Sequence, residues 1–137
     1  MMLDPRGPRF SAALTSAVLV LILVTGSGWL ALAQAAVFAI GTVDPRRTPY
    51  GLLYRWLVAP RLGPPTERED AAPVRFAQGV GLAFALVATV GYLAGAPVVG
   101  VVAAGFALAA AFLNAAFGLC LGCEAYLLLA RLRNRPA

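Results

Sequence analysis

FSAALTSAVLVLILVTGSGWLALAQAAVFAIGTV, residues 10–43, decides how this chain folds, because the stretch contains no charged side chain. A single helix of this length would measure about 51 Å, whereas the hydrocarbon core of a bilayer is about 30 Å thick. A Gly-Ser-Gly sequence at 26–28 interrupts the stretch near its middle. It therefore predicts two short membrane spans, about 11–25 and 29–43, joined as a helical hairpin.

A secretory signal peptide is the competing interpretation of this stretch, since Ala31-Leu32-Ala33 resembles a cleavage site after an apolar core. The residues after such a cut, 34–43, remain apolar and run directly into Asp44-Pro45-Arg46-Arg47. That ending is typical of a second span, so we favour the hairpin.

Two more apolar stretches follow a polar connection, residues 44–73, which holds six of the ten prolines. They predict spans at about 74–93 and 97–117. Within the connection, residues 49–58 mix aromatic, aliphatic and basic side chains and predict a short amphipathic helix in the headgroup plane. An irregular loop with anchoring aromatics is the alternative there. Residues 118–133 predict an interfacial helical extension.

Composition and charge place the whole chain, 1–137, in one membrane domain. Hydrophobic residues make up 61% of it and the mean hydropathy is +0.81. All eleven cations are arginines, gathered in both tails and the central connection. By the positive-inside rule, this distribution predicts an all-α, integral membrane four-helix bundle with both termini cytoplasmic, in the cytoplasmic (inner) membrane. The arginines would contact membrane lipids, and their segregation argues against nucleic acid as a partner.

The titratable residues exclude much of enzyme chemistry. The chain has no histidine, and five of its six carboxylates lie in predicted tails or loops. Histidine and clustered carboxylates supply most metal ligands and most general acids and bases. We therefore expect no conventional hydrolase site and no cofactor, and the sequence leaves open whether the protein is an enzyme at all.

The two cysteines, Cys120 and Cys123, lie three positions apart in GLCLGCEAY, residues 118–126. On a helix, this spacing puts both thiols on one face. If a helix restarts after Gly118, Cys120 lies near its N-terminus, where the helix dipole and free N–H groups favour a thiolate. The fourth span would end near residue 117, which puts both cysteines at the cytoplasmic edge of the membrane. Because Cys120 is nearer the possible helix start, it is the candidate attacking thiol and Cys123 is the resolving one.

Four polar residues are expected at the same level of the membrane. Arg75 and Gln78 begin the third span and Asn114 lies near the end of the fourth, so they would shape a pocket through charge and hydrogen bonds. Glu124 raises a neighbouring thiol pKa by its charge or relays a proton. An unpaired carboxylate at membrane depth is costly, which predicts an Arg75–Glu124 ion pair.

Three uses of the cysteine pair remain open at this point. The first is thiol–disulfide exchange or sulfur transfer. The second is binding of a soft metal by two thiolates and a carboxylate. The third is packing, as small residues in an Ala-rich helix interface, which suits a membrane scaffold or a small-molecule carrier.

Three motifs resemble one family. They are Asp4-Pro-Arg, Arg75-Phe-Ala-Gln and Asn114-x-x-x-Gly118-x-Cys120-x-Gly-Cys123-x-x-Tyr126. Together they are similar to a family of small bacterial integral membrane proteins known only as a domain of unknown function. The resemblance covers nearly the whole chain and implies a four-helix membrane protein. Members of that family are often encoded beside, or fused to, thioredoxin-like or sulfur-handling proteins, which implies a thioredoxin-like or sulfurtransferase partner.

Overall fold

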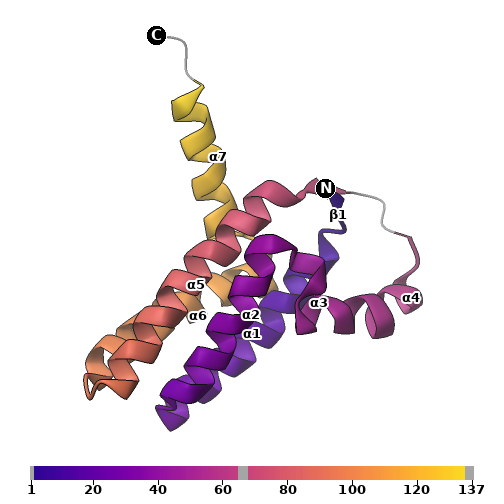
Figure 1. Ribbon diagram of the computed structural model, residues 1–137. Coiled ribbons are helices and arrows are strands. Elements are labelled where there is room, and N and C mark those ends of the chain that lie inside the picture. Colours follow the sequence, from indigo (N-terminus) through magenta and orange to yellow (C-terminus); the bar gives the residue numbers. More distant parts are fainter. Residues whose placement is uncertain (1, 65–67, 135–137) are drawn as a thin grey trace.

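The computed structural model describes residues 2–64 and 68–134 and is almost entirely helical (Figure 1). The all-α prediction is confirmed. The elements in chain order are β1 (Met2–Leu3), α1 (Arg6–Thr25), α2 (Gly28–Val43), η1 (Pro45–Arg47), α3 (Pro49–Leu53), η2 (Tyr54–Val58), α4 (Ala59–Leu62), β2 (Glu69–Asp70), α5 (Ala71–Leu93), α6 (Pro97–Phe117) and α7 (Leu121–Arg133).

The turn between α1 and α2 is built by the Gly-Ser-Gly interruption. Gly26 adopts φ +64°, a left-handed conformation that glycine tolerates, and its N–H donates to the carbonyl of Ile22 at 2.7 Å. Ser27 then caps the next helix, its hydroxyl accepting the N–H of Leu30 at 3.1 Å. These three residues therefore end one helix and begin another within a single turn.

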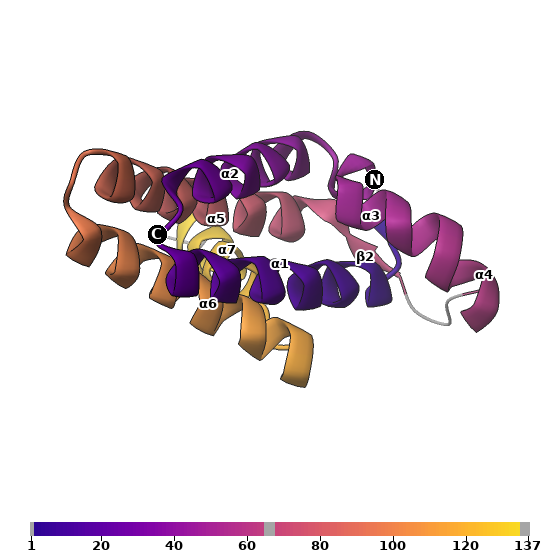
Figure 2. The same cartoon turned by 90° about the horizontal axis from the view of Figure 1, so that it is seen from below.

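The four long helices α1, α2, α5 and α6 pack side by side (Figures 1 and 2). α2 lies against α5, α5 against α6, and α6 against α1. The main core contains Leu19, Ile22, Ala31, Ala88, Ala103, Ala104 and Ala107. Most of these side chains are alanine, which lets helix backbones approach closely.

Glycines bring α2 and α5 into direct contact at two levels. A Cβ on Gly81 would lie 2.6 Å from the ring of Phe38. A Cβ on Gly41 would lie 2.5 Å from the side-chain oxygen of Gln78. Gln78 is therefore held against α2 as well as facing the site described below.

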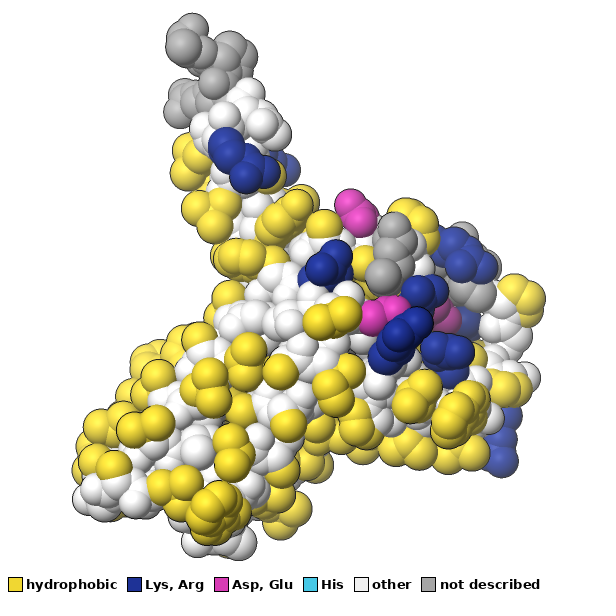
Figure 3. Space-filling view, viewed as in Figure 1, with side chains coloured by type: hydrophobic (Ala, Val, Ile, Leu, Met, Phe, Trp, Pro, Cys, Tyr) yellow, Lys and Arg dark blue, Asp and Glu magenta, His cyan; other side chains and the backbone are white. Residues whose placement is uncertain are grey.

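Three helices, α1, α5 and α6, are long and apolar enough to cross a membrane, while α2 is apolar but has only 16 residues. Hydrophobic side chains cover the flanks of the bundle, and charged ones gather at the end that carries β1 and α3 (Figure 3). At the opposite end, Trp29 in the α1–α2 hairpin is 69% exposed. The helices contain the four predicted ranges, and the crossings themselves stay a prediction.

The central connection is helical over a longer range than the predicted 49–58. α3, η2 and α4 run on from one another, and η2 is a π-helical turn. Pro60 has no N–H to donate to the preceding turn, which favours this local widening. The segment is tied to the bundle by Tyr50, whose hydroxyl donates to buried Gln34 at 2.7 Å. Trp56 remains 67% exposed.

A second small feature was not predicted. β1 and β2 pair antiparallel, with Met2 opposite Asp70 and Leu3 opposite Glu69. Two residues per strand give no periodic signal in a sequence, and the partners lie far apart along the chain. The pairing brings the N-terminus to the start of α5.

Candidate functional site

The break between α6 and α7 places the cysteines at a helix start. Gly118 ends α6 with φ +69°, and its N–H donates to the carbonyl of Asn114 at 2.9 Å. α7 begins three residues later with Cys120 as its N-cap. The helix therefore restarts after Gly118, which is the condition under which Cys120 lies at a helix N-terminus. Figure 1 shows α7 leaving the bundle and pointing away from it.

Cys120 and Cys123 form a disulfide, with their Cα atoms 5.2 Å apart. Sγ of Cys120 also accepts the backbone N–H of Cys123 at 3.1 Å. This is the position that a serine or aspartate oxygen normally takes at a helix N-cap. In the reduced protein, the same N–H and the helix dipole would stabilise a thiolate on Cys120.

The two sulfurs have different surroundings. Cys123 packs against a small core formed by Leu3, Ala71 and Val74, whereas Cys120 is not part of it. Next to Cys123, Gly122 lies so close to α5 that an added Cβ would meet Cβ of Ala77 at 2.6 Å. The start of α7 is therefore seated on α5, with Cys123 on the packed side.

The disulfide lines a cleft of about 500 Å³ between α1, α5, α6 and α7. Five of the six residues expected at the site line this cleft: Gln78, Asn114, Cys120, Cys123 and Glu124. The residues expected from the sequence therefore include cleft-lining residues at α5, α6 and the start of α7, but none of those that α1 contributes.

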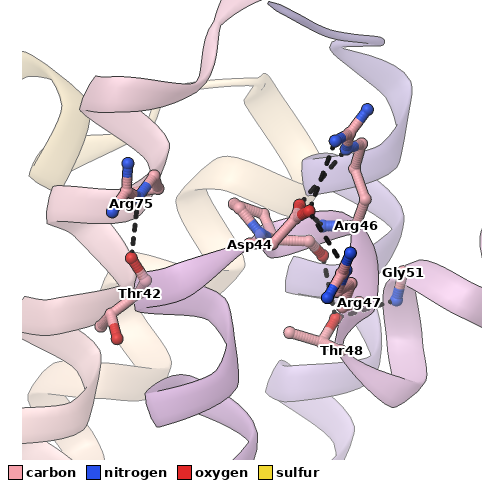
Figure 4. A network of polar contacts seen from close by, with 8 residues as sticks. Thr42, Asp44, Arg46, Arg47, Thr48, Gly51 and Arg75 are labelled. Carbon is pink, nitrogen blue, oxygen red and sulfur yellow. Dashed lines mark hydrogen bonds and ion pairs between the residues drawn. The ribbon is translucent and has the colours of Figure 1, made fainter. Parts of the chain in front are cut away.

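Arg75 is the sixth, and its expected role is wrong. Its Nε donates to the carbonyl of Thr42 at 2.8 Å, so the side chain caps the end of α2 and does not line the cleft (Figure 4). No ion pair joins Arg75 to Glu124 in the described chain, and Glu124 is exposed. An exposed carboxylate keeps its hydration, so the pairing that a buried one would require is unnecessary.

The arginine at the cleft is Arg9, from the first turns of α1. Its Nη2 donates to the carbonyl of Ala115 at 3.3 Å, near the end of α6. Its guanidinium also lies beside Gly118, where an added Cβ would be 3.6 Å from Nε. Sequence reasoning missed this residue, because nothing local to Arg9 shows that α6 will end beside it.

Acidic groups form the other part of the cleft rim. Asp70 accepts the N–H of Ala72 at 3.2 Å and caps α5. Glu69 also lines the cleft, and its pKa is raised by partial burial and by the negative charge of Asp4. With Glu124, three carboxylates therefore surround the mouth of the cleft.

Asp4 anchors the segment that packs against Cys123. Its carboxylate accepts the hydroxyl of Tyr54 at 2.6 Å and the Nη2 of Arg6 at 2.9 Å. Burial raises the pKa of Asp4, but the hydrogen bonds from Arg6 and Tyr54 outweigh burial and hold that pKa at about 2. Burial and the hydrogen bond to Asp4 raise the pKa of Tyr54 to about 12. Leu3, beside Asp4, belongs to the small core with Ala71 and Val74 of α5 against which Cys123 packs.

The repeated Asp-Pro-Arg sequence forms the same turn twice. Asp4 accepts the N–H and Nε of Arg6, each at 3.0 Å. Asp44 accepts the N–H of Arg46 at 3.0 Å and its Nε at 3.2 Å, and Arg47 also approaches this carboxylate (Figure 4). The repeated tripeptide therefore reflects the same turn chemistry at two helix boundaries.

A metal site gains no geometric support. Among residues 2–64 and 68–134, no group of three His, Cys, Asp or Glu side chains is placed to hold a metal ion. The cysteine pair with Glu124 therefore does not form a ligand set.

Residues 3–131 match the model of a protein family described as Domain of unknown function (DUF4395). The chain belongs to this family. The DUF4395 match includes the cleft residues on all four helices and so confirms the resemblance to a domain of unknown function. No curated protein and no solved structure matches the chain.

Proposed function

We propose that this DUF4395 protein is a multi-pass membrane protein that exchanges disulfides, or transfers sulfur, through Cys120 and Cys123. The observation that carries the proposal is the Cys120–Cys123 disulfide at the N-terminus of α7, at the wall of a cleft. Working dithiols are found where a helix start stabilises a thiolate that a partner can reach.

A purely structural role would gain little from this disulfide. The cysteines are three residues apart, so the closed loop is very short. Chain entropy gives such a loop about 2 kcal/mol, below the value for the long loops that stabilise secreted domains. The packing alternative also leaves unexplained why Sγ of Cys120 occupies the N-cap position.

The different surroundings of the two sulfurs support one order of steps in the exchange, in which Cys120 is attacked and Cys123 leaves. A thiolate of a reduced partner attacks Sγ of Cys120, the bond to Cys123 breaks, and Cys123 leaves as a thiolate that takes up a proton. The second thiolate of the partner attacks its own sulfur in the mixed disulfide and releases Cys120. The partner ends as a disulfide, and two electrons have passed to the pair. A soluble thioredoxin-like protein is the class of partner that supplies two such thiols. In sulfur transfer, the thiolate of reduced Cys120 attacks the outer sulfur of a sulfurtransferase persulfide, the bond between the two persulfide sulfurs breaks, and the cysteine of the sulfurtransferase leaves as a thiolate.

The arginine distribution supports a cytoplasmic position for the pair. Arginines lie at the charged end of the bundle and beyond it in α7, whereas the α1–α2 and α5–α6 turns have none. The positive-inside rule then puts this end in the cytoplasm of a cell with an inner membrane. Labelling of the reduced pair with an impermeant maleimide should occur in inverted vesicles and not in intact cells.

The direct test uses the protein in nanodiscs with a thioredoxin that lacks its resolving cysteine. The oxidised wild type should form a mixed disulfide that mass spectrometry assigns to Cys120. Cys123→Ser mixed with the disulfide form of a small aromatic thiol should be captured at the same sulfur, and a Cys120→Ser, Cys123→Ser double variant provides the background. No adduct above background would rule out the proposed exchange, and adducts spread equally over both cysteines would contradict the assignment of Cys120 as the attacked sulfur.

The alternative is a membrane scaffold or carrier in which the cysteines only pack. It is favoured by the many small residues on α6, such as Ala103, Ala104 and Ala107. The double serine variant separates the two functions. A scaffold would keep its partner and its abundance in that variant, whereas an exchange protein would remain folded and lose activity.

A further inference from the structure

The cleft beside the disulfide continues deep into the bundle. Its wall follows α5 from Pro73 to Phe84 and α6 from Ala107 to Gly118. At 1.5 Å per residue, each of these stretches runs about 16 Å along the helix. Both helices are long and apolar enough to cross a membrane, and the predicted crossings would put the deep part at the depth of lipid chains. The cleft thus connects the dithiol with the apolar interior.

The two ends of the cleft differ in character. The mouth carries the disulfide, Arg9, Asn114 and the three carboxylates. The deep part is lined mainly by apolar side chains, namely Phe38, Val80, Phe84, Ala107, Ala110 and Ala111, with the hydroxyl of buried Thr15 on the α1 wall. Ser11, which is 9% exposed, places a hydroxyl on the α1 wall between these regions. This polarity gradient matches a molecule with a polar head and an apolar tail.

We propose that the cleft binds a single-chain amphiphile whose polar head carries no negative charge, its chain between α1, α5 and α6 and its head beside Cys120. The volume of about 500 Å³ falls within the range of small-ligand sites. A hydrocarbon chain fills the apolar part of the cleft and supplies the dispersion contacts that its lining would lack if the space were empty. Binding of this ligand does not require thiol exchange, so the two proposals stand separately.

The charges at the mouth select the head. Glu69, Asp70 and Glu124 bring three carboxylates, against the single guanidinium of Arg9. That guanidinium is already engaged by the carbonyl of Ala115. A carboxylate or phosphate head would meet net repulsion there, whereas a hydroxyl head can donate to carboxylates and accept from Asn114. The cleft is therefore suited to an alcohol rather than to a fatty acid or a phospholipid.

The probe for this site is a photoreactive C16 alcohol, compared with the corresponding C16 carboxylic acid. The protein is held in phosphatidylcholine nanodiscs at pH 8, where the acid is charged, and cross-linked residues are identified by mass spectrometry. The alcohol should label cleft residues of α1, α5 and α6, and unlabelled alcohol should compete. Labelling by the acid at the same residues and to the same extent would overturn the choice of head and with it the proposal.

A pair of neighbouring substitutions tests the location. Ala110 lines the cleft, whereas Ala109 is exposed and does not. Ala110→Phe fills the cleft and should lower alcohol labelling about tenfold or more, while Ala109→Phe leaves it within about twofold. Ala111→Phe fills the same cleft and replaces Ala110→Phe if that variant does not fold. Equal labelling of the filled and control variants would overturn the proposal.

The double cysteine-to-serine variant keeps this inference distinct from the proposed function. That variant changes only the two sulfurs and keeps the wall of α1, α5 and α6 that holds the chain, so site-specific alcohol labelling should persist even though the contacts of the head with Cys120 are lost. Loss of thiol exchange with labelling retained supports both proposals. Exchange without site-specific labelling of the wild type would contradict the ligand site alone.

Discussion

Gly122, between the two cysteines, offers a sharp test of how α7 is seated. An alanine Cβ at this position would lie 2.6 Å from Cβ and 2.7 Å from Cα of Ala77 on α5. Carbon atoms in contact normally lie about 3.5 to 4.0 Å apart, so the shortfall is about 1 Å. Both opposing atoms belong to the rigid part of α5, and no flexible side chain can move aside. Gly122→Ala must therefore push α7, and the dithiol with it, away from α5.

The expected cost follows from two opposing effects. Overpacking of this kind costs about 1 to 3 kcal/mol. Replacing glycine by alanine inside a helix returns about 0.5 to 1 kcal/mol. The net loss in unfolding free energy is at most about 2.5 kcal/mol and about 1 kcal/mol at the centre of these ranges, which corresponds to a fall of about 3 to 5 °C in the midpoint temperature for a domain of this size.

The measurement is thermal unfolding of the oxidised protein in detergent, followed by intrinsic fluorescence. Gly105→Ala is the matched control, because nothing lies within 4 Å of a Cβ there. The control should keep or slightly raise the midpoint, since only the helix gain applies. If Gly122→Ala were as stable as Gly105→Ala, the contact between α7 and α5 described above would be wrong.

Three further predictions address the charges and thiols. Because the pKa of Asp4 is lowered to about 2, its carboxylate stabilises the fold above pH 4 and this contribution is lost as pH falls toward 2. Asp4→Asn should therefore reduce the free energy of unfolding at pH 7 by about 1 to 3 kcal/mol. Denaturant unfolding of this variant should also no longer show the loss of stability between pH 4 and 2. A variant with the acid dependence of the wild type would contradict the role given to Asp4. At pH 7, Cys123→Ser, which leaves the thiol of Cys120, should react with iodoacetamide about tenfold faster than Cys120→Ser, because one N–H bond to a thiolate is worth about 1.5 kcal/mol; equal rates would refute the assignment of the attacking sulfur. Arg9→Gln should slow that reaction of Cys120, whereas Arg75→Gln should leave it unchanged and lower only stability, and the opposite order would restore Arg75 to the site.

Local signals in the sequence predict the helices well. The Gly-Ser-Gly turn, the proline at the start of α6 and Gly118 at its end act through backbone preferences of single residues, so their effects can be inferred without a partner. The same reasoning places Cys120 at a helix start. Gln78, near the start of α5, and Asn114, near the end of α6, both line the cleft. The sequence places these two helix ends at the same end of the bundle.

Tertiary contacts account for what the sequence did not predict. Arg75 and Arg9 both lie near the charged end of the bundle, and only the packing of α2 against α5 and α6 against α1 decides which arginine meets which carbonyl. The Arg75–Glu124 prediction assumed a buried carboxylate, whereas α7 leaves the bundle and keeps Glu124 exposed. The β1–β2 pair is equally a long-range contact without a local pattern.

The redox midpoint of the Cys120–Cys123 pair tests the central claim most directly. The protein in nanodiscs is equilibrated with glutathione and dithiothreitol redox buffers, and the oxidised fraction is read by mass shift after alkylation. Exchange predicts a midpoint between about −270 and −120 mV, the range of working dithiols. A midpoint below about −300 mV, typical of structural disulfides, or a pair that never oxidises would contradict it.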